Sequence, residues 1–501
     1  MSDPQATLVS SLLEKNRYPH AARAVRLIET HISWILLAGR YAYKIKKAVH
    51  LDFLDFSSLE ARHFYCEEEI RLNGRLAGEI YLDVIPIGGS PESPIIGGLP
   101  AIEYAVRMKR FPMKNAFDRL AEKGLLKPVH LDLLAEKMAA FHASLLPAEV
   151  DSGYGMGMQD VMRKTFGGLK KYVRKDLSSL EKGMGDECVS LEAFFSRRLK
   201  EGYVRECHGD LHLGNIVLFK EKPVPFDCIE FDPKLRWIDL MNEIAFTVMD
   251  LLHHGLDGLA FRFLNAYLER TGDYGGVKAL RFHLANRAVV RAMVEAIRSE
   301  SDTPSCSRHL ALACNCLKGR KPFLVITHGL PGSGKTTFSQ TALERLKAIR
   351  IRSDVERKRM AGLSQYDRSH SGLFSGIYSP GFSKTVYSRL LDLARELLES
   401  GYPVIVDAAF LDGPARSRFM DLANSLSIPF AIASMSASNP ESRIMRRLGA
   451  GNDASDADLA VLEAKKASAD PLSREEQVQT ALFPDQGGEA WERLEQCLGL
   501  C

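Results

Sequence analysis

The sequence of 501 residues contains no apolar run that approaches the roughly 18 residues of a membrane-spanning helix. Its first residues, MSDPQATLVSSLLEKN, are too polar for a secretory signal peptide. The charges are nearly balanced, with a formal net charge of +3, so the chain lacks the concentrated positive charge of a dedicated duplex-DNA binder. These absences predict a cytoplasmic protein that has no membrane partner.

The nine cysteines are an odd number and form no regular framework, which argues against a secreted disulfide scaffold and favours reduced thiols. Four potential ligands, Cys306, His309, Cys314 and Cys316, lie close together in the sequence. Their spacing is not typical of a zinc site, and the run HLALACNCL is better explained as a packed amphipathic helix. The length of the chain predicts about two to four domains.

The stretch CHGDLHLGNIVLFKEKPVPFDCIEFD, residues 207–232, carries three polar residues in a suggestive order. Asp210 is followed five residues later by Asn215, and Asp227 follows two short strand-like runs. Phosphoryl transfer needs a carboxylate beside the acceptor hydroxyl, together with oxygen ligands for the magnesium ion on the phosphates of ATP. We therefore predict that Asp210 orients or deprotonates the acceptor and that Asn215 and Asp227 hold Mg²⁺. The alternative is a loop whose Asp and Asn side chains only stabilise turns.

An ATP-positioning lysine is predicted upstream of this stretch. THISWILLAGRYAYKIKKAV alternates like a hairpin that turns at residues 38–40, and its second strand carries Lys44. The helix that follows offers Glu67, Glu68 and Glu69 as partners, of which we favour Glu69 and place Glu68 second. The alternative is that these glutamates, together with Lys46 and Lys47, form a solvated face. No G-x-G-x-x-G loop precedes Lys44, unlike in protein kinases.

The surrounding segments complete the picture of this half. Residues 5–16 and 19–28 suggest two short helices, and residues 79–87 and 102–112 suggest strands that lead to a hinge. A long apolar helix after Trp237 bears Asp239 and Glu243. Buried carboxylates at these positions are expected to bond the backbone of the catalytic loop.

The second half begins with KPFLVITHGLPGSGKTTFSQTALERL, an apolar strand, a glycine-rich turn and a helix. It matches G-x-x-x-x-G-K-T with the strand before it and the helix after it, which is the structural context that this motif requires. Backbone N–H groups of such a loop surround phosphates, the lysine neutralises them, and Thr336 binds magnesium. The predicted nucleotide-binding residues are Gly329, Gly332, Ser333, Gly334, Lys335, Thr336 and Thr337.

The rest of this half alternates strands and helices, which predicts a parallel sheet covered by helices on both faces. Asp407 follows the strand YPVIV and is a candidate magnesium carboxylate. Asp354 and Arg357 in S-D-x-x-R are candidates for the acceptor side of the site, and Arg443 and Arg447 for a lid that closes on the phosphate. The alternatives are that Asp354 caps a helix and that the arginines form an exposed face.

The run THIS…YAYKIKK, then HGDLHLGN, FDCIEFD and WIDL, resembles the aminoglycoside phosphotransferase-like family of the kinase superfamily. The P-loop half resembles the group of polynucleotide kinase, zeta toxin and gluconate kinase, and the order of the halves resembles the bifunctional aminoglycoside phosphotransferase/ATP-binding proteins. The resemblance implies an α+β two-lobed kinase-like domain over residues 1–298 and a helical connector over 299–321. It implies an α/β P-loop domain with a parallel sheet over 322–501.

These observations predict a kinase with ATP and Mg²⁺ at two sites. The preferred acceptor is a small-molecule hydroxyl, and a nucleic-acid end is possible but not favoured because no stripe of aromatic and basic residues is present. Two alternatives stay open. One half could be an active kinase regulated by a nucleotide-sensing partner domain, or the chain could be a non-catalytic ATP-dependent interaction module. The oligomeric state is not predicted.

Overall fold

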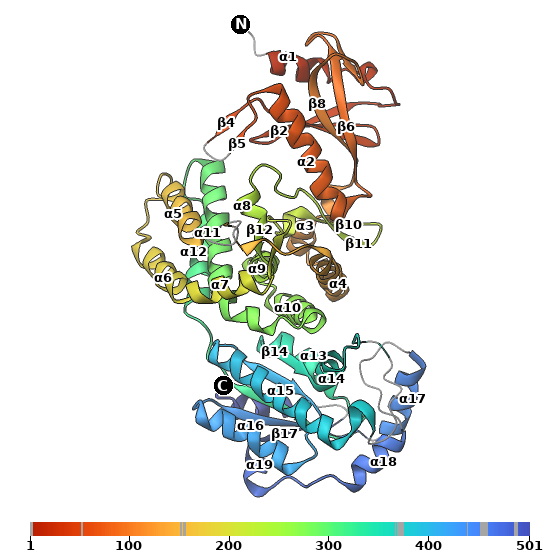
Figure 1. Ribbon diagram of the computed structural model, residues 1–501, viewed down its shortest axis with the longest axis vertical. Coiled ribbons are helices and arrows are strands. Elements are labelled where there is room, and N and C mark those ends of the chain that lie inside the picture. The colour runs from red at the N-terminus through yellow and green to blue at the C-terminus, as the bar shows by residue number, and fades with distance from the viewer. Residues whose placement is uncertain are drawn as a thin grey trace. The chain divides into compact units, whose positions relative to one another are not determined.

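The computed structural model describes residues 4–51, 54–150, 153, 157–365, 367, 375–437, 439–450, 459–484 and 489–500, without the side chains of residues 51 and 446–450. The chain divides into two compact units. The first comprises residues 1–174 and 185–250, and the second comprises residues 175–184 and 251–501. The ribbon is coloured along the chain in Figure 1. The domain limits at residues 298 and 321 were set by resemblance to known families, whereas the two units are defined by compactness. These limits therefore stay a prediction.

An antiparallel sheet of six strands, in the order β1-β2-β3-β8-β6-β7, forms the N-terminal part of the first unit (Figure 1). The predicted hairpin turns at Gly39, whose φ of +56° suits glycine and whose Cβ, if it had one, would lie 2.5 Å from the Ala21 carbonyl oxygen. The strands are β1 (Val25–Glu29), β2 (Ser33–Ala38), β3 (Tyr41–Lys46), β6 (Tyr81–Gly89), β7 (Pro94–Ile96) and β8 (Ala101–Lys109).

The helix expected over residues 19–28 is wrong. Val25–Glu29 form strand β1 at the edge of the sheet, paired along its whole length with β2. The helix-forming Ala, Arg and Leu residues of this segment are overridden because Val25 and Leu27 pack against the core beneath the sheet. The helix expected over residues 5–16 is shorter than predicted and covers Pro4–Ser11.

The other elements of the first unit are helices and short strands, some of which pack against the sheet. Helix α2 (Leu59–Ala77) begins at Ser58, whose hydroxyl accepts from the Ala61 N–H, and packs against β6 and β8. The other elements are α1 (Pro4–Ser11), β4 (His50–Leu51), β5 (Leu54–Asp55), α3 (Phe117–Glu122), α4 (Pro128–Ser144), α5 (Met158–Leu169), α7 (Glu192–Lys200), β9 (Val204–Glu206), η4 (Leu213–Asn215), β10 (Ile216–Phe219), β11 (Lys222–Pro225), α8 (Pro233–Arg236) and β12 (Trp237–Asp239). Two further helices, α6 (Ser178–Ser190) and α9 (Leu240–His253), each contribute residues to both units.

The second unit contains a fully parallel sheet of five strands in the order β14-β15-β13-β16-β17. The carboxyl ends of parallel strands meet at one edge, so the residues after β13, β14 and β15 lie close together. The predicted parallel sheet is present, and its edge strand β17 was not predicted. The strands are β13 (Leu324–His328), β14 (Ile349–Arg352), β15 (Val404–Asp407), β16 (Phe430–Met435) and β17 (Thr480–Phe483).

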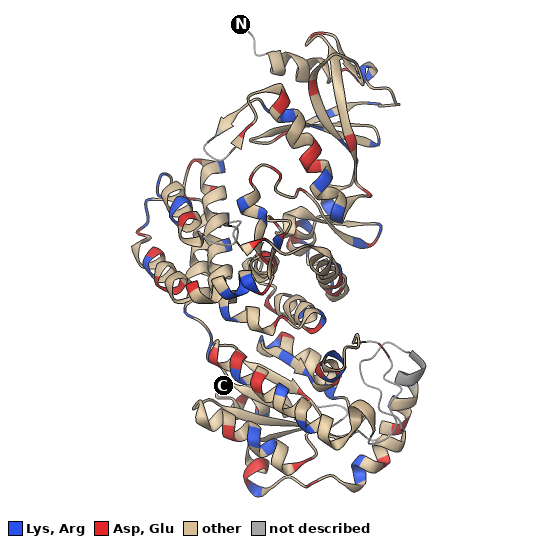
Figure 2. Ribbon diagram, in the orientation of Figure 1, with Lys and Arg blue, Asp and Glu red and all other residues tan. Residues whose placement is uncertain are grey.

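Helices pack against this sheet. Helices α15 (Pro380–Glu399) and α16 (Gly413–Ser425) lie side by side over it, and α15 carries both basic and acidic residues (Figures 1 and 2). Helices α13 (Lys335–Leu346) and α20 (Ala490–Cys497) are joined by Phe338 and Trp491, whose ring centroids are 5.2 Å apart. The other elements are α10 (Asp257–Thr271), η5 (Tyr274–Ala279), α11 (Leu280–Ser299), α12 (Pro304–Leu317), α14 (Ser353–Met360), η6 (Gly376–Tyr378), α17 (Pro440–Ala450), α18 (Leu459–Ala467) and α19 (Arg474–Val478).

The predicted fold class is confirmed. A kinase-like domain with a strand-rich and a helical lobe is followed by an α/β P-loop domain built on a parallel sheet. Among the described helices, none combines the length and the apolar character needed to cross a membrane.

Candidate active sites

Three charged residues from separate elements of the first unit meet around one ammonium group. Lys44 Nζ on β3 donates to Glu69 Oε1 on α2 at 2.8 Å and to Asp227 Oδ1, after β11, at 2.7 Å. Lys44 and Glu69 are buried, whereas the Asp227 side chain keeps 46% of its surface exposed. Glu69, which the sequence analysis favours among the three glutamates, is therefore the residue that contacts Lys44.

The charge of Glu69 is maintained against burial. Removing the carboxylate from water would by itself raise its pKa, but Lys44 and Lys46 outweigh that effect and hold the pKa at about 2. The opposite charges therefore persist through the physiological range. A lysine held between two carboxylates is fixed in direction, as a phosphate-binding ammonium group requires.

The predicted catalytic loop is fixed to α9 through its backbone. Glu243 Oε1 accepts from the His208 N–H at 2.7 Å and Glu243 Oε2 accepts from the Gly209 N–H at 3.0 Å. This is the contact that the sequence analysis expected for a carboxylate on this helix. Asp239 does not share it, because its two oxygens bind Arg198 at 2.7 and 2.8 Å.

Asp210 and Asn215 lie together in this loop. Asn215 Nδ2 donates to Asp210 Oδ2 at 2.9 Å and to the Asp210 carbonyl oxygen at 3.1 Å. His212 adds a third contact, because its Nε2 lies 3.5 Å from Asp210 Oδ2 while its Nδ1 accepts from the Gly214 N–H at 3.0 Å. His212 was not predicted as a site residue, although it lies two residues after Asp210 in the motif.

Asn215 and Asp227 are joined through the intervening residue. Asn215 directly precedes β10, and Asp227 lies two residues after its partner strand β11. The Phe226 N–H donates to the Asn215 carbonyl oxygen at 2.9 Å, which holds the two ends of this hairpin together. Asp227 has a φ of +64°, a conformation that Asp tolerates better than most residues. Carboxylate and amide oxygens suit Mg²⁺, and the exposed Asp227 carboxylate fits that donor set. Asp210, Asn215 and Asp227 are thus brought into one region.

Two further residues of this site, Lys46 and Glu230, were missed. Lys46 Nζ donates to Glu69 Oε2 at 2.7 Å and also to Glu230 Oε1. Lys46 is fully buried, so it does not belong to the solvated face offered as an alternative. The sequence contained a signal for Lys46. Residues two apart on a strand share one face, so the Lys46 side chain was bound to lie on the same face of the strand as Lys44. Glu230 had no comparable local signal.

The glycine-rich loop of the second unit is shaped for close backbone approach. A Cβ on Gly329, at φ +143°, would lie 2.6 Å from the Met435 carbonyl oxygen and 2.8 Å from Ser333 Oγ. A Cβ on Gly332 would lie 2.6 Å from the Pro440 carbonyl oxygen. The Ser333 hydroxyl is buried and has no hydrogen-bond partner among the residues that the structure describes. A buried hydroxyl of this kind beside the N-terminus of α13 fits a phosphate ligand.

Lys335 and Asp407 both lie at this edge of the sheet. Lys335 Nζ donates to the carbonyl oxygens of Gly329 and Leu330 at 2.9 and 2.8 Å. Asp407 ends β15, is buried, and accepts from Ser339 Oγ at 2.9 Å, with Arg352 Nε at 3.8 Å. Thr336 and Thr337 occupy the first turn of α13, immediately after Lys335. The loop, Thr336 and the carboxylate therefore share one end of the sheet.

The predicted acceptor residues Asp354 and Arg357 lie on α14, whereas the predicted lid residue Arg443 lies on α17. Asp354 is the second residue of α14, half-buried at the carboxyl end of β14. Arg357 binds the Ile377 carbonyl oxygen at 2.6 Å and Ser383 Oγ at 3.1 Å, which ties α14 to η6 and α15. Arg443 Nη1 lies 3.2 Å from the position of a Cβ on Gly334, so this side chain reaches the P-loop. The side chain of Arg447 lies outside the described residues.

The fold and these two groups of residues define a kinase-type protein with a nucleotide-binding P-loop domain. The model of an AAA domain family, AAA_33, matches residues 324–472.

Similar proteins are known from mycobacteria. The uncharacterized protein Rv2004c of Mycobacterium tuberculosis (strain H37Rv) is 33% identical over 462 residues, which cover 88% of this chain and 90% of that protein. The uncharacterized protein Mb2027c of Mycobacterium bovis matches with the same values. Solved structures include a choline kinase from Cryptosporidium parvum (TM-score 0.40, 12% identity, 63% of this chain and 95% of that chain) and a gluconokinase from Sinorhizobium meliloti (TM-score 0.26, 18% identity, 36% and 91%). The chain belongs to the family of the mycobacterial proteins.

Proposed function

We propose that this protein is an ATP- and magnesium-dependent phosphotransferase with two kinase-type sites, a kinase-like domain of the aminoglycoside phosphotransferase type joined to a P-loop kinase domain. The first site phosphorylates a small-molecule hydroxyl, and the second is a P-loop kinase of the polynucleotide or gluconate kinase type. The observation that carries the proposal is the charged cluster in which the buried Lys44 bridges Glu69 and Asp227 at 2.8 and 2.7 Å. A lysine held between a helix glutamate and a loop aspartate is the arrangement that aligns a triphosphate.

At the first site, Lys44 positions the phosphates of ATP, and Glu69 keeps its ammonium group in place. Asp210 orients or deprotonates the acceptor hydroxyl, as its place beside Asn215 supports. Asn215 and Asp227 would hold Mg²⁺, which supplies positive charge to the transferring phosphoryl group when bound.

At the second site, the backbone of Gly329, Gly332 and Gly334 together with Lys335 holds the nucleotide phosphates. Thr336 and Asp407 would hold Mg²⁺. Asp354 and Arg357 serve the acceptor, and Arg443 and Arg447 close on the phosphate. The proposed limits are residues 1–298 for the kinase-like domain, 299–321 for the connector and 322–501 for the P-loop domain.

The acceptor class and the cellular location are also proposals. A small-molecule hydroxyl is favoured over a nucleic-acid end because the sequence carries no stripe of aromatic and basic residues, and both signs of charge occur on α15 (Figure 2). The eight cysteines among the described residues are free thiols, which supports a location in the cytoplasm.

One observation favours a second candidate function, in which the P-loop half acts as a nucleotide sensor for the first. Helix α10 belongs to the proposed kinase-like domain, and its Glu269 is joined to Asp407 through Arg350 and Ser339. Nucleotide and metal bound at Asp407 could therefore bias the position of α10. A sensor would bind ATP at the P-loop without transferring phosphate to an acceptor.

The proposed function is tested by phosphate transfer from labelled ATP in the presence of magnesium. A panel of metabolites, nucleosides, aminoglycosides and 5′-hydroxyl oligonucleotides is offered to the wild type and to the Asp210→Asn and Lys335→Ala variants. An acceptor lost only in Asp210→Asn assigns transfer to the first site, and one lost only in Lys335→Ala assigns it to the second. If ATP binds at both sites but no acceptor is labelled, the proposed enzymatic activity is contradicted. That result would favour a non-catalytic interaction module.

A further inference from the structure

Two buried lysines lie on the same face of strand β3. Lys44 and Lys46 are two residues apart, so their side chains project from the same side of the strand. Each takes one oxygen of the same carboxylate: Lys44 Nζ donates to Glu69 Oε1 at 2.8 Å and Lys46 Nζ donates to Glu69 Oε2 at 2.7 Å. Glu69 is thus held at both of its oxygens.

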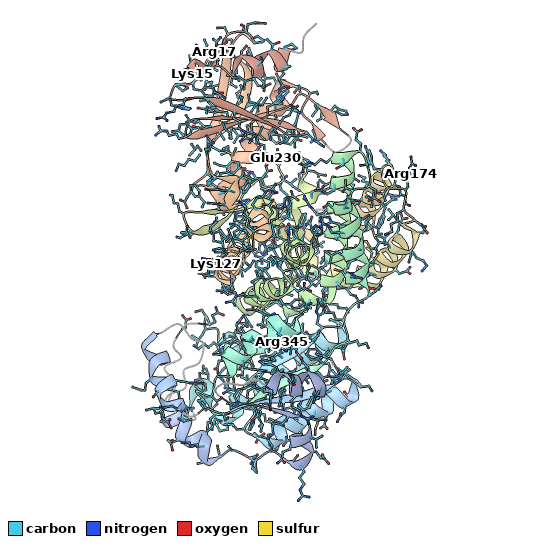
Figure 3. The ribbon with its side chains drawn as sticks, turned by 180° about the vertical axis from the view of Figure 1, so that it is seen from behind. Lys15, Arg17, Lys127, Arg174, Glu230 and Arg345 are labelled. Atoms are coloured by element: carbon cyan, nitrogen blue, oxygen red, sulfur yellow. The ribbon has the colours of Figure 1, made fainter. Side chains whose placement is uncertain are left out.

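Lys46 is in turn held by a carboxylate from another part of the fold. Its ammonium group donates to Glu230 Oε1, on the loop that follows β11, and the two side chains are 0% and 5% exposed. Figure 3 labels Glu230 beside the N-terminal sheet. Charges from β3, α2 and this loop therefore form one chain of contacts in the order Asp227, Lys44, Glu69, Lys46 and Glu230.

A buried ion pair is costly to form, which makes a purely stabilising role a poor explanation of Lys46. Burial would lower the pKa of Lys46, but Glu230 and Glu69 raise it above its ordinary value, so the ammonium stays charged. A carboxylate held at one oxygen can pivot about that contact, whereas one held at both oxygens has a single orientation. The contact between Lys46 and Glu69 Oε2 therefore fixes the position of Glu69 Oε1, the oxygen that accepts from Lys44.

We infer that Lys46, fixed by Glu230, is the second anchor of Glu69, and that these two residues position Lys44 for the phosphates of ATP. The inference rests on the proposed function of the first site. Lys46 and Glu230 are positioning residues that act through Glu69 and Lys44, and they do not contact the nucleotide in this scheme. Their loss should weaken binding of a triphosphate while sparing recognition of the nucleoside.

The neighbouring residue offers a matched control. Lys47 Nζ donates to Glu29 Oε1 at 2.5 Å, and the Glu29 side chain is 59% exposed. Lys47 follows directly after β3, so this pair joins the next residue of the chain to another carboxylate, but the Glu29 side chain lies at the surface and the pair has no contact with Glu69 among those described. Neutralising Glu29 changes the net charge as much as neutralising Glu230 does.

The test uses the full-length chain with Lys335→Ala, which removes the P-loop lysine so that nucleotide binding reports the first site. Calorimetric titration measures the dissociation constants of Mg·ATP and of adenosine for this parent and for added Glu230→Gln, Lys46→Gln or Glu29→Gln. Thermal unfolding of each variant checks that it is folded. If Glu230→Gln does not fold, Lys46→Gln answers the same question.

We expect Glu230→Gln to raise the Mg·ATP dissociation constant about tenfold and Lys46→Gln to raise it at least as much. Adenosine, which has no phosphate for Lys44, should bind within roughly twofold of the parent, and Glu29→Gln should change neither constant. In a Lys44→Met background, Glu230→Gln should have no further effect, because Glu230 acts through Lys44.

Unchanged Mg·ATP affinity in folded Glu230→Gln or Lys46→Gln overturns the inference while the proposed function stands. Equal losses for ATP and adenosine, or full additivity with Lys44→Met, assign the pair a structural role and overturn it as well. If the Lys335→Ala parent does not bind Mg·ATP, the proposed function of the first site is wrong. The inference, which rests on that function, is then wrong as well.

Discussion

At the scale of single residues, the first site depends on a histidine that stays uncharged. His208 Nε2 donates to the Phe226 carbonyl oxygen at 2.9 Å, and its Nδ1 accepts from the Asp210 N–H at 3.3 Å. Only the neutral ring can both donate and accept in this way. Burial lowers the pKa of His208 to about 4, against a partial opposing effect of Asp210. The ring therefore joins the Asp210 and Asp227 segments without carrying charge.

This depressed pKa predicts a loss of stability in acid. Below its ordinary pKa of 6.5, His208 takes up a proton in the unfolded chain but not in the folded one until the pH nears 4, so stability falls as the pH drops through this window. The thermal midpoint of the wild type should fall between pH 7 and pH 5. His208→Gln should start lower and fall less steeply, and parallel curves for the two proteins would contradict this assignment.

His212 allows a sharper test at the same scale. Because its Nδ1 accepts from the Gly214 N–H, the neutral ring carries its proton on Nε2, which faces Asp210 Oδ2. Asn at this position would keep the cap of η4, since its oxygen can accept from the same N–H, but it would not reach Asp210. We expect His212→Asn to lower the transfer rate about tenfold without changing the KM for ATP.

Steady-state kinetics with the acceptor found in the panel measures both constants. His212→Ala, which also removes the cap, should in addition lower the thermal midpoint. A wild-type rate in His212→Asn would show that the contact with Asp210 has no part in transfer.

At the scale of elements, helix α9 holds the backbone of the predicted catalytic loop. Glu243 accepts from two consecutive backbone N–H groups, a task that Gln cannot fully perform because its amide nitrogen is a donor. Glu243→Gln should therefore destabilise the protein by about 2 kcal/mol, since one buried N–H loses its acceptor. Urea unfolding followed by circular dichroism measures this change.

Glu92→Gln, at an exposed position between β6 and β7 of the same unit, serves as a comparison for the loss of one negative charge. If Glu243→Gln were no less stable than Glu92→Gln, the backbone contacts of Glu243 would not be important for the loop.

The elements that could be predicted from the sequence are those with local causes. The strand, glycine turn and helix around Lys335 are adjacent in the chain, and the hairpin at Gly39 is closed by its own turn. Strand β1 was mistaken for a helix because its state is decided by pairing with β2 and packing on the core. Strand β17, which completes the parallel sheet after several intervening elements, was likewise not visible.

The same distinction applies to the sites. Asp210, Asn215 and Asp227 are close in sequence and were found by their spacing. Lys46 could have been found from strand alternation, but its partner Glu230 lies 184 positions away. A contact between such distant positions depends on the tertiary fold, and no local pattern predicts it.

At the scale of the whole molecule, the second unit shows how the P-loop sheet depends on a helix outside the predicted P-loop domain. Asn265 on α10 donates to the Ala348 carbonyl oxygen at 3.0 Å and accepts from the Arg350 N–H at 2.6 Å. The side-chain amide thus pairs with the backbone of β14, the edge strand of the sheet. An isolated fragment of residues 322–501 would expose this edge.

Glu269, one turn further along α10, extends this dependence to Asp407, the proposed magnesium ligand. It binds Arg350 Nη2 at 2.6 Å, Arg350 Nη1 donates to Ser339 Oγ at 3.2 Å, and Ser339 donates to Asp407. Glu269→Gln leaves the buried Arg350 without its counter-charge, so the support of Asp407 should loosen. We predict about tenfold weaker binding of Mg·ADP at the P-loop, measured in a full-length chain whose first site is silenced by Lys44→Met.

Glu344→Gln is the matched control for this prediction, because Glu344 also joins α10 to α13, through Arg262 at 2.7 Å, but at a partly exposed position away from Arg350. It should leave Mg·ADP binding within roughly twofold of the parent, as expected for an exposed ion pair. If the two variants behaved alike, Glu269 would contribute only to the packing of α10. If Glu269→Gln alone weakens binding, α10 contributes to the binding free energy of nucleotide at the P-loop. Separating the halves at residue 322 would then remove that contribution.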